Sequence, residues 1–70
     1  MDYYVEKRKM HITLENMIKK SGKKGVNIDQ IIYSLTGKFS VGEKAIHNRI
    51  ELLERLGVVE KDDQFVKWLQ

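Results

Sequence analysis

Residues 40–59 read SVGEKAIHNRIELLERLGVV, and this stretch carries most of the information about the fold. Ser40 followed three positions later by Glu43 is the pattern of a capping box, which marks the start of a helix. Apolar residues then recur at spacings of four and three, as on one face of a helix: Ala45, Ile46, Ile50, Leu53 and Leu56. Gly57 is expected to end this helix, because glycine lets a chain leave a helix sharply. The stretch therefore predicts a helix over residues 40–56.

The C-terminal residues predict a β-hairpin. Two β-prone runs, residues 58–61 and 65–69, are separated by the turn-forming segment of residues 62–64. Val66 and Trp68 fall on one face of the second strand, because side chains alternate along a strand. We expect that face to cover the helices.

A shorter helix is predicted just before residue 40. Asn27 is placed as its N-cap, with Gln30 as the capping-box partner. Gly37 is expected to stop it, so that residues 36–39 join it to the next helix at a steep angle. Its apolar face is Ile28, Ile31, Ile32 and Leu35. Val26 is expected to pair as a strand of one or two residues.

The longest predicted helix runs from about Tyr3 to Ser21, and Gly22 is placed to adopt a positive φ at its end. Its apolar stripe is Tyr3, Met10, Leu14, Met17 and Ile18. The predicted core of the whole domain is Leu14, Met17, Ile18, Ile28, Ile31, Ile32, Leu35, Ile46, Ile50, Leu53, Phe65 and Trp68.

Residues 40–59 resemble the recognition helix and first wing strand of winged helix-turn-helix proteins. In that family the helix ends in Leu-x-x-Leu/Ala-Gly, followed by two apolar residues. Here those positions are Leu53, Leu56, Gly57, Val58 and Val59. The resemblance covers about residues 10–69 and is to bacterial and archaeal transcriptional regulators, including those of archaeal viruses and plasmids.

The resemblance implies one mainly α domain over residues 1–70, with three helices and a wing of two or three strands formed around a β-hairpin. Residues 1–9 are interpreted as an N-terminal extension of the first helix. The implied function is DNA binding, with the helix of residues 40–56 in the major groove of double-stranded DNA.

The composition is that of a small globular domain. Of the 70 residues, 41% are hydrophobic and 33% are charged. The longest apolar run is three residues, whereas a membrane span needs about 18. We also expect no signal peptide, because no apolar segment follows the charged N-terminus. The chain has no cysteine, which excludes disulfides and cysteine-based zinc sites. These features favour a cytoplasmic protein.

Catalytic and metal-binding patterns are not found. His11 and His47 are the only histidines, and neither has further ligands at metal-binding spacing. No glycine-rich phosphate loop precedes a helix, and no Ser-His-Asp arrangement is suggested. We therefore expect no enzyme activity, no cofactor, no metal and no small-molecule effector.

The positive charge is concentrated at the start of the chain. Residues 1–24 carry seven basic and three acidic side chains, whereas residues 25–70 carry six basic and seven acidic ones. A basic stripe attracts phosphates. The alternative is a solvated helix face with no partner.

A helix in the major groove contacts base edges with exposed residues near its N-terminus. In the predicted helix these are Lys44, His47 and Asn48, which lie opposite the apolar residues. An asparagine can bond to adenine at two points, and a lysine can donate to guanine. The full predicted DNA-binding set is Lys38, Ser40, Lys44, His47, Asn48, Lys61 and Lys67.

Other charged residues complicate this assignment. Arg49 lies within the apolar arc, so we expect its stem to pack over the core edge while its guanidinium reaches solvent or a phosphate. Glu51 points toward the presumed DNA side. Asp62 and Asp63 at the hairpin tip would be repelled by the minor groove, so insertion of the tip is not expected.

Two functions are compatible with these observations. One is a DNA-binding transcriptional regulator, favoured by the basic N-terminal third and by the exposed polar residues of the helix. The other is a winged-helix adaptor that binds proteins within a larger assembly. The adaptor is favoured by the near-neutral charge of residues 25–70.

A homodimer is also predicted. Val5 and Ile12 lie about 180° and 160° from Leu14 around the first helix, on its outer face. Two apolar residues one heptad apart suit a helix pair, and Tyr4 is placed to flank them. The alternative is that they are isolated apolar residues of an ordinary surface.

Overall fold

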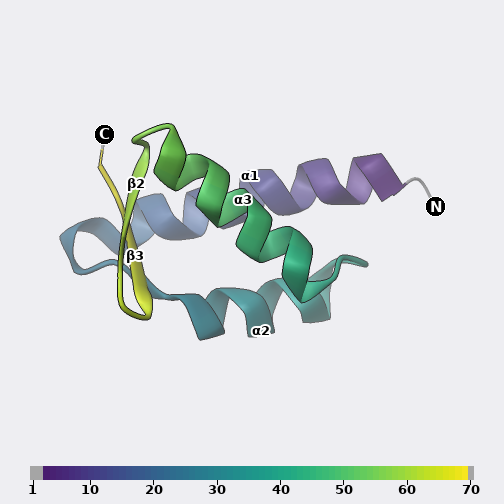
Figure 1. Cartoon of the computed structure of the whole chain (residues 1–70). Helices are drawn as coiled ribbons and strands as arrows, with labels where there is room; N and C mark the ends of the chain where they lie inside the picture. Colours follow the sequence, from purple (N-terminus) through teal and green to yellow (C-terminus); the bar gives the residue numbers. More distant parts are fainter. Residues whose placement is uncertain (1–2, 70) are drawn as a thin grey trace.

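The computed structural model describes residues 3–69, which form three helices and a small antiparallel sheet (Figure 1). The elements in chain order are α1 (Tyr3–Ser21), the 3-10 turn η1 (Gly22–Lys24), β1 (Val26–Asn27), α2 (Ile28–Lys38), α3 (Glu43–Arg55), β2 (Val59–Asp62) and β3 (Phe65–Trp68). In Figure 1, α3 crosses in front of α1, α2 lies below both, and the hairpin closes the end away from the N-terminus. This agrees with the predicted order of three helices and a hairpin.

No helix within residues 3–69 is long and apolar enough to cross a membrane.

The sheet has three strands in the order β1-β3-β2, all antiparallel. Val26 pairs with Val66, so the predicted two-residue strand joins the hairpin. Val59 pairs with Trp68 at the other edge of β3. The turn between β2 and β3 is one residue shorter than predicted, because Asp62 still belongs to β2. Asp63 makes the turn with a φ of 56°.

The core is formed by the inner faces of all three helices and of the sheet. Its buried members are Met10, Leu14, Ile18, Ile28, Ile31, Leu35, Val41, Ile46, Ile50, Leu53, Val59 and Val66. Three other residues that were predicted in the core are half-buried and pack against these residues: Met17, Ile32 and Trp68. Phe65 was predicted in the core, but it is 48% exposed. Side chains alternate along β3, so Phe65 faces away from the side that Val66 and Trp68 present to the helices. The predicted contribution of the Tyr3 side chain lies outside the described residues.

The start of α2 agrees with the prediction, and its end does not. The side chain of Asn27 accepts a hydrogen bond of 2.8 Å from the backbone N–H of Asp29, and so caps the helix. The predicted stop at Gly37 is wrong. The helix continues to Lys38, and the N–H of Phe39 donates to the carbonyl of Leu35. Gly37 does not have a positive φ, and it lies within the helix.

The start of α3 also differs from the prediction. The helix begins at Glu43, with Gly42 at its N-cap and no side-chain capping bond, so Ser40 does not form the predicted capping box. Val41 is only 8% exposed and packs in the core. Val41 therefore enters the core from the connection that precedes the helix. Both Phe39 and Gly42 have extended backbone angles.

Two glycines end helices as predicted, with φ of 63° at Gly22 and 74° at Gly57. A third, Gly25, has a φ of 77° and lies against the central strand. A Cβ atom at Gly25 would lie 2.9 Å from the carbonyl oxygen of Val66. Close approach of the backbone to β3 therefore requires glycine here.

Candidate nucleic-acid interface

The first half of α3 presents a polar face to solvent. Lys44, His47 and Asn48 are all exposed, while Ile46 and Ile50 on the opposite side are buried. This separation of polar and apolar residues follows from the period of the helix, because residues three and four positions apart share a face. The structure thus places the three predicted base-contacting residues together on one surface.

Acidic side chains share part of this face. The carboxylate of Glu43 lies 3.5 Å from Nε2 of His47, one turn along the helix, and forms an ion pair when the imidazole is protonated. Glu51 is exposed, as expected. The polar face of α3 is therefore mixed in charge when taken alone.

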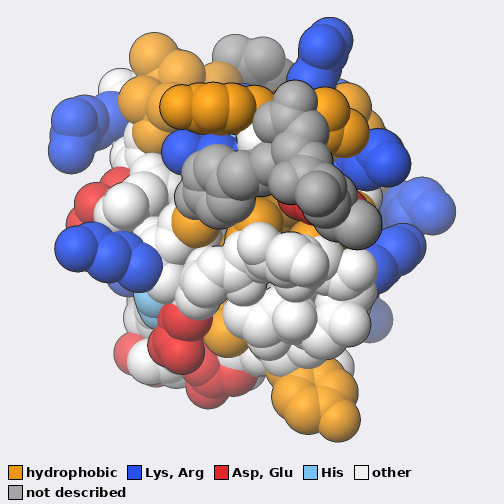
Figure 2. Space-filling view, turned by 90° about the vertical axis from the view of Figure 1, so that its right-hand side faces the viewer, with side chains coloured by type: hydrophobic (Ala, Val, Ile, Leu, Met, Phe, Trp, Pro, Cys, Tyr) orange, Lys and Arg blue, Asp and Glu red, His pale blue; other side chains and the backbone are white. Residues whose placement is uncertain are grey.

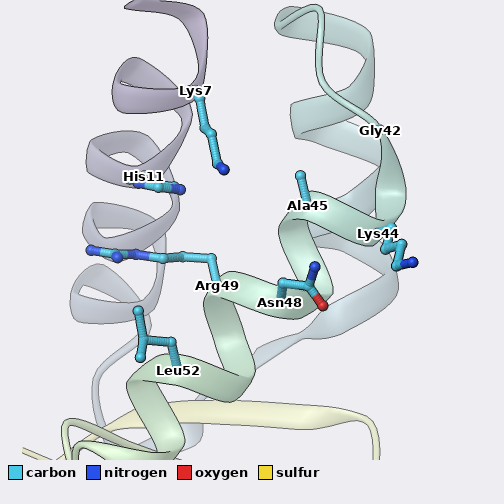
Figure 3. Close-up of a pocket in the computed structure, with 8 residues that line it drawn as sticks. All are labelled: Lys7, His11, Gly42, Lys44, Ala45, Asn48, Arg49 and Leu52. Atoms are coloured by element: carbon cyan, nitrogen blue, oxygen red, sulfur yellow. The ribbon is translucent and has the colours of Figure 1, made fainter. Parts of the chain in front are cut away.

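A groove of about 420 Å³ runs between α1 and α3. Its side chains come from Lys7 and His11 on α1 and from Lys44, Ala45, Asn48, Arg49 and Leu52 on α3, together with the backbone of Gly42. Figure 3 shows Lys7 and His11 directed from α1 toward α3, and Arg49 crossing in the opposite direction. None of these lining residues is acidic. We call this surface the α1–α3 groove.

Arg49 connects the two walls of the groove. Its Nη2 donates a hydrogen bond of 2.8 Å to Oε2 of Glu15, and the side chains are 26% and 24% exposed. The guanidinium therefore pairs with Glu15, while part of the side chain stays in contact with solvent as expected. The arginine extends across to α1, where a carboxylate of opposite charge is available. Nε of Arg49 is buried and has no hydrogen-bond partner among the described residues.

The pKa of His11 depends on the burial and the charges around its imidazole in the groove. Partial burial lowers the pKa of His11 below its ordinary value of 6.5, and the charges of Arg49 and Lys7 lower it further. Glu15 acts in the opposite direction. Positive charge therefore prevails around this imidazole, which favours its neutral form.

The sequence interpretation noted the basic charge of residues 1–24 but assigned none of the groove residues of α1. Lys7, His11 and Glu15 are spaced four residues apart, so they lie on one face of the helix. That spacing was the available signal. It does not reveal which neighbouring helix the face meets, because that depends on long-range packing.

The remaining predicted DNA-binding residues lie apart from the groove. Lys38 ends α2, with its Nζ 5.8 Å from the ring centre of Phe39, and Ser40 is exposed in the connection to α3. Lys61 is exposed on β2. Nζ of Lys67 lies 3.7 Å from the carboxylate of Glu60, which offsets part of its charge.

The hairpin tip is acidic, as the sequence indicated. Asp62 and Asp63 are both exposed. Because β2 follows the C-terminal end of α3, the hairpin lies at the opposite end of that helix from Lys44. The predicted phosphate-binding lysines are thus divided between the two ends of α3.

The residues predicted for a dimer are exposed on α1. Tyr4, Val5 and Ile12 are 78%, 46% and 56% exposed. Figure 2 looks at the molecule from the N-terminal end of α1 and shows basic side chains projecting on both sides, with hydrophobic ones gathered along the upper edge. Both kinds of surface therefore meet at this end of the molecule.

Comparisons of the chain with protein-family models, curated proteins and solved structures found no match in any of the three. Within residues 3–69, no three His, Asp or Glu side chains are grouped so that they could hold a metal ion. The function is therefore inferred from the residues and geometry of this chain.

Proposed function

We propose that the protein is a winged-helix DNA-binding protein, a transcriptional regulator that places the first half of α3 in the major groove. The arrangement of three helices followed by a β-hairpin supports this proposal, with β1 as the third strand of the wing. The connection from Phe39 to Gly42 is short, and α3 is inclined to α2 (Figure 1), which is compatible with a helix-turn-helix.

One observation carries the proposal. Lys44 and Asn48 are exposed on the first turns of α3 and also line the α1–α3 groove, where no lining side chain is acidic. A helix with donors at its exposed start, beside a positively charged groove, suits a polymer with base edges next to phosphates.

The proposed division of roles follows from position. Lys44, His47 and Asn48 contact base edges from α3. The other predicted residues contact the phosphate backbone from the flanking segments: Lys38, Ser40, Lys61 and Lys67. The acidic tip of the hairpin stays outside the minor groove, because its negative potential repels carboxylates.

A homodimer formed through Tyr4, Val5 and Ile12 is part of this proposal. A two-fold axis through α1 would present two copies of α3 to the two halves of a palindromic site. The exposure of these apolar side chains on one helix supports it.

The test is a salt titration of binding to duplex DNA. Each neutralised phosphate contributes a slope of about −0.9 to log K against log salt, so affinity should fall steeply between about 50 and 200 mM salt. Lys44→Gln should weaken binding, whereas Lys23→Gln, the same change in the exposed turn η1, should leave it nearly unchanged. The proposal fails if no duplex binding is detected at the lowest salt.

A protein-binding adaptor is the second candidate, and the exposed aromatic of α2 favours it. Tyr33 is 85% exposed beside an open depression lined also by Met17. Exposed aromatic residues are common at the centres of protein interfaces. Lack of duplex binding at low salt would favour this candidate.

A further inference from the structure

We infer that the α1–α3 groove binds one phosphate group of the DNA backbone, through Lys7 and His11 of α1. The inference rests on the proposed function. It extends the DNA interface beyond α3 to a helix that none of the predicted DNA-binding residues occupies.

The shape and lining of the groove support this inference. Lys7 and His11 lie one turn apart on α1 and point toward α3 (Figure 3). Lys44 and Asn48 of α3 also belong to the lining. Because those two residues also belong to the exposed face of α3, a duplex bound to that face passes directly over the groove. The backbone phosphate nearest α1 would then meet a lysine and an imidazole.

The charge of the groove depends on a contact between one of its lining residues and a carboxylate of α1. Glu15 lies on the same face of α1 as Lys7 and His11, and its carboxylate accepts a hydrogen bond from Arg49, which lines the groove. The charges of Glu15 and Arg49 offset each other, so the remaining charged side chains of the lining are Lys7 and Lys44. An anion entering the groove therefore meets net positive charge.

The start of α3 also lies at the groove. Gly42 is the N-cap of α3 and has no side-chain capping bond, and both Gly42 and Ala45 line the groove. The N–H of Ala45 donates to the carbonyl of Gly42, and the positive end of the helix dipole favours an anion at this margin.

Binding of a phosphate would change the titration of His11. In the free protein, burial and the charges of Arg49 and Lys7 lower the pKa of His11, and Glu15 opposes them. A nearby phosphate favours the charged imidazolium and would raise the pKa. By linkage, binding must then strengthen as pH falls. Lys44 on α3 is the remaining cation that lines the groove.

The first experiment measures the pKa of His11 by NMR, with the intact protein alone, with duplex DNA, and with sodium sulfate against chloride at equal ionic strength. Sulfate is a tetrahedral oxyanion that does not titrate near neutral pH. With duplex, we expect the pKa of His11 to rise toward or above 6.5. Lys7→Gln should reduce the rise. Lys9→Gln, the same change on an exposed position of α1, should not.

The second experiment measures duplex affinity of the same variants. Lys7→Gln should weaken binding to all sequences alike and reduce the log–log salt slope by about one, as loss of a phosphate contact does. Lys9→Gln should keep the slope. His11→Gln should remove the part of the pH dependence that His11 causes.

The outcomes separate this inference from the proposed function. If duplex binds through α3 but the pKa of His11 stays unchanged and the two lysine variants behave alike, the groove is not a phosphate site, although DNA binding stands. A rise with sulfate but not with duplex would overturn the DNA backbone as the source of the phosphate. Absence of any duplex binding would overturn both proposals.

Discussion

The guanidinium of Arg49 and the carboxylate of Glu15 lie 2.8 Å apart and join α3 to α1 beside the groove. The two residues are 34 positions apart in the chain, so their contact depends on tertiary packing. Both side chains are only about a quarter exposed, at 26% and 24%. A charge-assisted hydrogen bond in such a position is stronger than one in open solvent.

Glu15→Gln should lower the free energy of unfolding by about 1–2 kcal/mol, because the arginine would lose its charged partner. Urea denaturation measures this change. Glu60→Gln is the matched control, since Glu60 pairs with Lys67 at 3.7 Å on a more exposed surface. That variant should lose at most about 0.5 kcal/mol. Equal losses would show that the Glu15 contact adds no stability of its own.

Ile50→Ala should cost about 2–5 kcal/mol, because Ile50 is 2% exposed and its loss leaves a cavity between the helices. In a domain of this size, such a loss can prevent folding. Leu56→Ala is the control at the end of the same helix, where the side chain is 65% exposed. Thermal melting followed by circular dichroism compares them. If the Ile50 variant melts like the parent protein, Ile50 does not pack in the core.

The helical faces of the core were predictable because a buried stripe must repeat with the period of the helix. Leu14, Ile31 and Ile50 are all buried as expected. Phe65 was assigned by its hydrophobicity alone, although its position in the strand places it on the opposite face from Val66. Because side chains alternate along a strand, the burial of Val66 already predicts that Phe65 faces away from the core.

Two other features required knowledge of tertiary structure. The capping box at Ser40 does not form, and the neighbouring Val41 packs in the core, a contact that a local pattern cannot anticipate. The α1–α3 groove depends on how far apart two helices pack that are distant in the chain, as the contact of Arg49 with Glu15 illustrates. The exposed polar face of α3 and the basic charge of the N-terminal third were predictable, whereas the position of Lys7 and His11 beside α3 was not.

Alanine substitutions at three glycines should have different effects. Gly37→Ala should stabilise the protein by about 0.5–1 kcal/mol, because this residue is helical and an added Cβ meets nothing within 4 Å. Gly22→Ala should cost about 1 kcal/mol, from the strain of its φ of +63° in open space. Gly25→Ala should cost more than about 2 kcal/mol, because strain adds to the approach to Val66. Denaturant midpoints rank the three. A different order would contradict this account of their backbone positions.

Asn48→Ala and Lys61→Ala should affect DNA binding in different ways. Loss of Asn48 should cost about 1–3 kcal/mol on the preferred duplex and relax the base preference at one position. Loss of Lys61 should weaken binding to preferred and random duplexes equally, because a phosphate contact carries no sequence information. Binding measured on both duplexes separates the two effects. The assignment of roles fails if both variants lose the same affinity on both duplexes.

The parent protein should sediment as a dimer at micromolar concentration, through the outer face of α1. Val5 and Ile12 lie one heptad apart and are 46% and 56% exposed, so a second copy of α1 can cover both. Tyr4, on the adjacent position, flanks them. Dimerisation would also add buried apolar area to a domain whose single core is small.

The double variant Val5→Lys/Ile12→Lys tests the same face, because four buried lysines in the dimer would repel one another. It should sediment as a monomer with an unchanged helical spectrum, since both positions are exposed. Its affinity for a palindromic duplex should fall, while its affinity for a single half-site should remain. A parent protein already monomeric near 8.3 kDa would exclude the dimer, and a double variant that stays dimeric would place the interface elsewhere.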